Sequence, residues 1–192
     1  DNIPSRRAPV LTVCIIALNV LVYLYEWGIG EAACERFVFR YGVIPHEFQI
    51  IGKGHEVVVV QVRQAILRDP ALEIHPVVQE YELEGTFFGA VLPLLTSMFL
   101  HGGWMHVIGN MWFLWLFGDN VEDRLGRFRY VVLYLLSGIA AAASQVYFNW
   151  GESTPMIGAS GAVAGVLGAY MITYPYARVL AFVPFFYFFW PV

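Results

Sequence analysis

Long runs without a charged residue divide this chain of 192 residues and limit what it can fold into. A helix needs about 20 apolar residues to cross the hydrocarbon core of a bilayer. Four runs reach or approach this length, whereas a fifth run of 14 residues would rise only about 21 Å as a helix. The sequence therefore predicts four complete transmembrane helices and part of a fifth, in the runs 8–25, 85–118, 130–151, 153–177 and 179–192.

The composition favours a membrane protein over the other classes. Hydrophobic residues make up 58% of the chain and charged residues only 14%, whereas soluble domains are about a quarter charged. The aromatic content of 17% excludes a disordered chain. A net charge of −4 provides no basic surface for nucleic acid. We therefore predict an all-α polytopic membrane protein whose surroundings are the lipid bilayer and which binds no nucleic acid.

One polar segment, residues 30–84, carries 14 of the 26 charged residues. We expect it to form a long extramembrane loop between the first two helices, with some helix and with parts lying on the membrane surface. The first apolar run is longer than the core of a typical signal peptide, and no A-x-A-like cleavage site follows it closely. We therefore expect a retained helix, and a single membrane domain over 1–192 that contains the 30–84 loop.

The arginines near the helix ends predict the orientation, because such residues concentrate in cytoplasmic loops. They precede the first helix, lie between the second and third helices, and follow the fourth helix, all on one side of the predicted membrane. The loop 151–157 has none. We therefore expect a cytoplasmic N-terminus, with the loops 30–84 and 151–157 outside. The residues concerned are Arg6, Arg7, Arg124, Arg127, Arg129 and Arg178.

Polar residues inside the apolar runs are candidates for function, because they are costly in a membrane. The second run contains His101-x4-His106-x3-Asn110, and the fourth contains Gly158-Ala-Ser160-Gly161. His106 and Asn110 are four residues apart and therefore share one helix face. Both helices run from outside to inside, which places the two motifs at a similar depth in the outer leaflet.

Each of these residues also has a purely structural interpretation. Ser160 can serve as a small packing residue, and Asn110 can form an interhelical hydrogen bond worth about 1 kcal/mol. Gly161, Gly165 and Gly168 form a face that a neighbouring helix can approach closely, and we expect a helix beyond Val192 to occupy it. The two histidines would lie about 140° apart on a helix, with no carboxylate or thiolate beside them in that run. We therefore predict no metal site.

The two motifs together, in this order, resemble the rhomboid family of intramembrane serine proteases. The turn Gly118–Gly126 and the helix order are similar to those of bacterial rhomboids. The resemblance implies a rhomboid-like helix bundle in the bacterial inner membrane and a protease that needs no cofactor. It implies that substrates are transmembrane segments of membrane proteins, cut near the outer face.

The resemblance also implies a role for each motif residue. Ser160 would be the nucleophile, and His106 and Asn110 would complete an oxyanion hole with the free N–H groups of the helix start. His101 would have a supporting role in positioning the first loop and nearby water. Gly158 and Gly161 would leave room for the substrate backbone.

A serine nucleophile needs a general base, which the family supplies as a histidine from the sixth helix. No histidine follows His106 here, and the chain begins at Asp1 without a methionine. We therefore expect a fragment that is inactive by itself, with the base histidine beyond Val192. The alternatives are a catalytically inactive rhomboid-like protein that binds transmembrane helices, and a small transporter or channel component. The last is disfavoured because the runs contain no pair of carboxylates for ion coupling.

Overall fold

A computed structural model describes residues 8–62 and 77–177 of the chain. The predicted partial helix 179–192 and three of the arginines used for orientation, Arg6, Arg7 and Arg178, lie outside the described residues. The elements are α1 (Val10–Gly28), α2 (Glu31–Tyr41), the 3-10 helix η1 (Pro45–Phe48), β1 (Glu56–Val62), β2 (Val77–Leu83), α3 (Phe87–Val91), α4 (Pro93–Thr96), the 3-10 helix η2 (Ser97–Phe99), α5 (Trp104–Leu125), α6 (Arg127–Phe148) and α7 (Ser160–Thr173).

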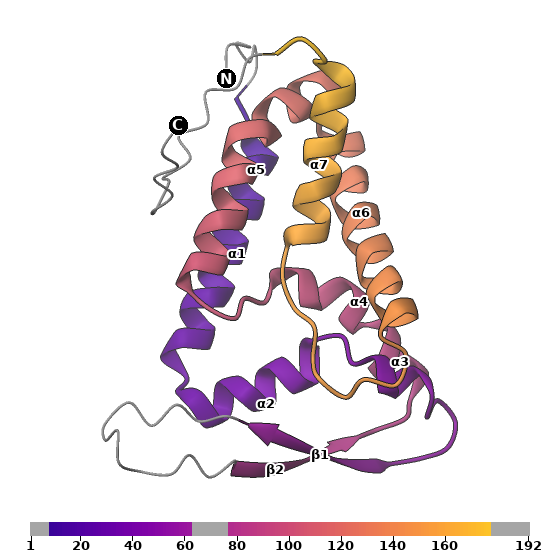
Figure 1. Cartoon of the computed structure of the whole chain (residues 1–192). Coiled ribbons are helices and arrows are strands. Elements are labelled where there is room, and N and C mark those ends of the chain that lie inside the picture. Colours follow the sequence, from indigo (N-terminus) through magenta and orange to yellow (C-terminus); the bar gives the residue numbers. More distant parts are fainter. Residues whose placement is uncertain (1–7, 63–76, 178–192) are drawn as a thin grey trace, which may run out of the picture.

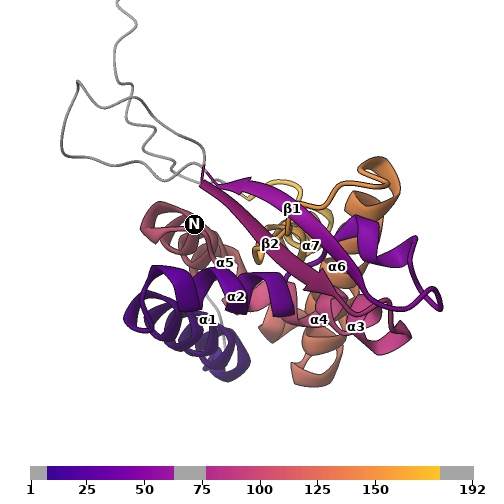
Figure 2. The same cartoon turned by 90° about the horizontal axis from the view of Figure 1, so that it is seen from below.

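The longer helices α1, α5, α6 and α7 form a bundle, and the shorter elements gather at one end of it (Figure 1). Seen along the bundle, α2, the strand pair and the short helices spread across this end (Figure 2). The mostly helical bundle confirms the predicted fold class. Helix α7 begins part of the way along the bundle, near the level at which α5 begins (Figure 1). The two motifs therefore lie at a similar level, as the sequence predicts.

The apolar helices differ in whether they can cross a membrane. By length and composition, α1 and α6 can each do so. The segments Phe87–Phe99 and Trp104–Leu125 qualify together as one broken span with a bend of 77°. Helix α7 has only 14 residues and rises about 21 Å, which is less than the full span predicted for 153–177. Residues 149–159 are instead used as a loop that leads to the start of α7.

The predicted second run, 85–118, does not form one straight helix. Pro93 begins α4, where its missing N–H costs no hydrogen bond, and the Gly102-Gly103 pair separates η2 from α5. His101 therefore precedes α5 instead of lying on it, while His106 and Asn110 both lie on this helix.

The 30–84 segment contains helix, as predicted, and also an antiparallel hairpin that the sequence analysis did not predict. Strands β1 and β2 pair with Val58 opposite Tyr81. The four consecutive valines at 57–60 favour a strand because β-branched residues fit a pleated surface. Val58, Tyr81 and Leu83 are buried, and Phe39 of α2 stacks on Tyr81 with ring centroids 3.5 Å apart. The hairpin is thereby joined to α2.

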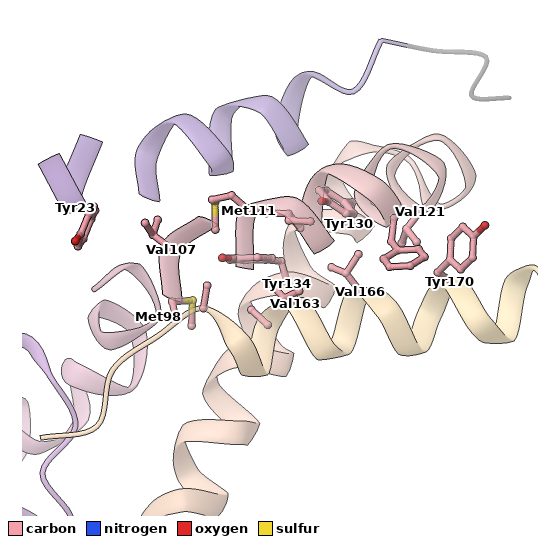
Figure 3. Close-up of a cluster of buried hydrophobic side chains, with 14 residues drawn as sticks. Tyr23, Met98, Val107, Met111, Val121, Tyr130, Tyr134, Val163, Val166 and Tyr170 are labelled. Carbon is pink, nitrogen blue, oxygen red and sulfur yellow. The ribbon is translucent and has the colours of Figure 1, made fainter. Parts of the chain in front are cut away.

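The main core lies where α5, α6 and α7 meet, and Figure 3 shows the side chains that fill it. Close contact between α6 and α7 depends on glycine. A Cβ atom at Gly161 would lie 2.2 Å from Cβ of Ala141. A Cβ at Gly165 would overlap the side chain of Ser137, and one at Gly168 would meet nothing within 4 Å. The expectation of a helix beyond Val192 on this face is therefore wrong for Gly161 and Gly165, because α6 already occupies both positions.

The start of α1 is attached to the end of α5 by one buried carboxylate. Oε1 of Glu122 accepts a hydrogen bond from the N–H of Leu11 at 3.0 Å. Oε2 accepts from the N–H of Thr12 at 2.8 Å and from its hydroxyl at 2.9 Å. The same hydroxyl lies 3.0 Å from that of Tyr130 on α6. Glu122 thus satisfies N–H groups that a helix start leaves unpaired and joins three helices.

Candidate active site

Ser160 is the first residue of α7, and its side chain is exposed. It lines a cavity of about 690 Å³ between α6, α7 and η2, together with Ser97, Met98, Gly138 and Gln145. Among the described residues, no N-cap side chain caps the first turn of α7. A helix start leaves its first backbone N–H groups without intrahelical partners and carries the positive end of the helix dipole, so it can bind an anion in the cavity. A hydroxyl at this position can therefore attack a carbonyl group that enters the cavity.

Gly158 brings the turn before α7 against His106. A Cβ atom at Gly158 would lie 2.7 Å from both Cε1 and Nε2 of the His106 ring. The backbone of Gly158 also has a φ of +128°, which side chains other than glycine rarely tolerate. Its N–H donates to the carbonyl of Ser97 at 2.9 Å, which fixes the turn. The structure thus places the imidazole ring of His106 against Gly158, which precedes Ser160 by two positions in the chain.

Asn110 lies one turn further along α5 and is buried. Its Nδ2 donates a hydrogen bond to the carbonyl of His106 at 2.9 Å. A primary amide has two N–H donors, so one remains for another acceptor. The predicted shared face of His106 and Asn110 is therefore present in the structure. Neither residue lines the cavity beside Ser160, and His106 adjoins it through Gly158, which does.

His101 is buried behind His106. The two rings meet edge to face, with centroids 5.1 Å apart and planes at 68°. The backbone N–H of His101 donates to Oε2 of Glu26 on α1 at 3.2 Å. Among the residues that the structure describes, no group of three or more His, Cys, Asp or Glu side chains could hold a metal ion.

The structure therefore brings together Gly158, Ser160, His106 and His101, with Asn110 on the adjoining turn of α5. Gly161 both lines the cavity and contacts α6, so it combines the space beside Ser160 with the helix packing expected of it, although the partner helix is α6. Glu26, the charged residue that directly follows the run 8–25, was not predicted to belong to the site. Its signal was a carboxylate close to the end of an apolar helix.

Such a bundle, with polar motifs at the starts of two apolar helices, defines an integral membrane protein with an internal polar site. The sequence model of the rhomboid domain matches residues 89–192, which is more than half of the chain. This chain belongs to the rhomboid family.

Several curated proteins are similar to this chain. Rhomboid protein 1, mitochondrial, of Saccharomyces cerevisiae is 32% identical over 105 residues, which cover 53% of this chain and 30% of that protein. Presenilin-associated rhomboid-like protein A, mitochondrial, of Danio rerio is 33% identical, with 46% and 24% covered. RHOMBOID-like protein 6, mitochondrial, of Arabidopsis thaliana is 36% identical, with 40% and 24% covered.

The matched part of this chain thus spans only 24–30% of the length of these relatives. No solved structure matches it. All three relatives are mitochondrial by name, so the comparisons do not support the bacterial inner membrane expected from the sequence. They support an integral membrane protein of the rhomboid family.

Proposed function

We propose that this chain carries the nucleophile and the oxyanion hole of an intramembrane serine endopeptidase. The contact between Gly158 and the ring of His106 is the observation that carries the proposal, because it joins the two motifs beside an exposed serine. A cavity of about 690 Å³ at Ser160 provides room for an extended stretch of peptide. The proposed substrates are transmembrane segments of other membrane proteins.

The proposed reaction begins when Oγ of Ser160 attacks a peptide carbonyl and its proton passes to a general base. The negative charge that develops on the carbonyl oxygen is stabilised by His106, by the free N–H of Asn110 and by backbone N–H groups at the start of α7. The carbon–nitrogen bond then breaks, the leaving amine takes the proton, and water hydrolyses the acyl-enzyme. By resemblance to the family, the base is a histidine that follows residue 192 in the complete protein.

Labelling with a fluorophosphonate probe tests this proposal on the complete gene product in liposomes. The probe forms a covalent bond only with an activated serine. We expect labelling of the wild type and none of Ser160→Ala, and we expect the same contrast in cleavage of a reporter-tagged transmembrane segment. Ser144→Ala on α6 is the matched control, because its exposed hydroxyl donates to the carbonyl of Ala140 within its own helix. Equal labelling of Ser160→Ala and wild type would exclude Ser160 as the nucleophile.

We also propose that the loop 151–157 lies on the outer side of the membrane and the turn 119–129 on the cytoplasmic side, as the arginines between α5 and α6 suggest. Single cysteines introduced in each segment, after replacement of Cys14 and Cys34, should react with an impermeant maleimide from opposite sides. The reverse labelling pattern would move Ser160 to the other leaflet and overturn cleavage near the outer face.

A helix-binding protein without catalysis is the second candidate function, motivated by the absence of a histidine after His106 in this sequence. It predicts that the complete protein retains a transmembrane segment in co-purification but resists the probe. The proposed protease is labelled at Ser160 under the same conditions.

A further inference from the structure

A group of buried polar atoms that the proposed mechanism does not use lies beside the site. Glu26 is 2% exposed and His101 is 3% exposed. Oε2 of Glu26 accepts the backbone N–H of His101, as described above. Oε1 of Glu26 and both ring nitrogens of His101 have no hydrogen-bond partner among the described residues. The backbone of Phe99 lies near the His101 ring without meeting hydrogen-bond geometry.

Three unpaired atoms in one place point to a small polar ligand. Leaving a buried polar group unpaired costs about 1–3 kcal/mol, so protein interiors pair nearly all of them. Oε1 and Oε2 of Glu26 belong to the same carboxylate, and Oε2 accepts the backbone N–H of His101, whose ring nitrogens are unpaired. A water molecule between Oε1 of Glu26 and one ring nitrogen of His101 can satisfy two of the three atoms, since a buried water makes about three hydrogen bonds. The other ring nitrogen points in a different direction and takes a partner of its own.

This polar group is continuous with the reacting residues. The ring of His101 meets that of His106 at 5.1 Å between centroids. His106 in turn lies against Gly158, where even one added carbon would come within 2.7 Å of its ring. A displacement of His101 would therefore be transmitted to His106, because packed side chains cannot shift independently.

We propose that Glu26 is a positioning residue of this site: with His101 it holds a bound water molecule and thereby fixes the ring of His106 against Gly158. The inference rests on the proposed protease function and deepens it. Glu26 touches neither substrate nor reacting atoms, so it acts through His106. It brings α1, a helix that supplies none of the motif residues, into the site.

Substitution of Glu26 in the complete protein, reconstituted in liposomes, tests this role. In Glu26→Leu we expect kcat to fall roughly 10- to 100-fold, because small misplacements of catalytic groups have effects of this size, while KM changes less than about threefold. Glu26→Gln should retain kcat within about threefold, since its amide oxygen still accepts the N–H of His101 and its NH₂ can donate to water. Glu31→Leu, at the exposed first residue of α2, is the matched control and should match wild type.

A double-mutant cycle separates positioning from general damage. If Glu26 acts through His106, adding Glu26→Leu to His106→Ala should lower kcat by less than about twofold further, because interacting residues are not additive. The full single-mutant loss in that background would overturn the inference. Water-edited solid-state NMR on protein with ¹⁵N-labelled histidine measures the water directly. We expect transfer from water to the His101 ring in wild type and its loss in Glu26→Leu.

The outcomes distinguish the two proposals. A wild type that the fluorophosphonate probe does not label at Ser160 overturns the protease function and the inference with it. Labelling of wild type together with unchanged kcat in Glu26→Leu overturns only the role of Glu26. A lower unfolding temperature accompanied by unchanged kcat in the folded fraction also overturns it, because Glu26 would then serve stability alone.

Discussion

Two buried carboxylates, those of Glu122 and Glu26, lie at opposite ends of the bundle and differ in how many hydrogen bonds they accept. Glu122 receives three hydrogen bonds from Leu11 and Thr12, and both of its oxygens are used. Glu26 receives one, from His101, and its second oxygen has no partner among the described residues. Both side chains are less than 5% exposed, so the difference lies in their partners and not in their burial.

This difference in hydrogen bonding indicates that the region around Glu122 stabilises the fold and that the region around Glu26 is suited to function. A fully paired network of buried polar groups rigidifies a protein, whereas an unpaired group is costly and concentrates where a ligand or reaction needs it. The Glu122 end joins α1, α5 and α6 with paired groups. The Glu26 end adjoins His106 and Gly158, beside the exposed serine. We therefore expect substitutions at the Glu122 end to change stability and those at the Glu26 end to change turnover.

The largest effect on turnover is expected from the oxyanion donors. His106→Ala and Asn110→Ala should each lower kcat roughly 10- to 1000-fold in the complete protein, as loss of one such donor does. The fold should largely survive Asn110→Ala, because one interhelical hydrogen bond contributes about 1 kcal/mol. Initial rates of cleavage of a reporter-tagged transmembrane segment, with unfolding temperatures alongside, provide the measurement. Full activity in the double variant His106→Ala/Asn110→Ala would show that neither residue binds the oxyanion.

The largest effect on stability is expected at Glu122. Glu122→Ala removes the acceptor of two backbone N–H groups and one hydroxyl, so the free energy of unfolding should fall by about 2–4 kcal/mol. Unfolding in mixed micelles, with increasing SDS, measures this loss. The kcat of the protein that remains folded should stay within about threefold of wild type. If Glu122→Ala lost much of its kcat without losing stability, the Glu122 end would not differ from the Glu26 end in serving stability alone.

A smaller effect at the same end is expected from Thr12→Val, which keeps the shape of the side chain. The valine removes the hydroxyl that bonds to Glu122 and lies beside that of Tyr130, while the backbone N–H of residue 12 still reaches the carboxylate. The free energy of unfolding should therefore fall by about 1–2 kcal/mol, clearly less than in Glu122→Ala. An equal loss in the two variants would mean that the hydroxyl, and not the helix start, carries the interaction.

The sequence alone predicts the helical class and the placement of both motifs, because charge-free runs and intramembrane polar residues are local signals. His106 and Asn110 lie on one face of α5, and Ser160 begins α7, as their spacing implies. The catalytic roles of these residues remain predictions. The strand pair at residues 56–62 and 77–83 was missed, although its valine run was visible, because strand pairing depends on a partner that is distant in the chain.

Contacts between distant residues could not be predicted from spacing. Gly158 lines the cavity, as its expected role of leaving room for substrate requires, and its contact with the His106 ring is the part that spacing could not predict. The partner of Gly161 and Gly165 is α6, which presents Ser137 and Ala141. These small residues are four positions apart, a spacing typical of helix packing in membranes, but spacing alone does not say which helix packs on which. The role of Glu26 could not be predicted from spacing either, because only the folded chain brings it into contact with His101. Local patterns identify the reacting groups, and tertiary contacts decide how they are held.

A third buried carboxylate, that of Glu47 in η1, lies among the short elements at the same end of the bundle as Glu26 (Figure 1) and provides the smallest test. Burial, and secondarily the charge of Glu84, raise the pKa of Glu47, while Arg40 opposes them. A carboxyl group with a raised pKa in the folded state favours folding in its neutral form, and this contribution is lost as the pH rises through the folded pKa. Glu47→Gln, which stays neutral, should therefore unfold at a slightly higher temperature than wild type at pH 7.5, and at the same temperature at pH 4. Thermal unfolding in detergent at the two pH values measures the difference, with the exposed Glu31→Gln as control. A lower unfolding temperature of Glu47→Gln at pH 7.5 would mean that the carboxylate has a stabilising partner, as Glu122 does.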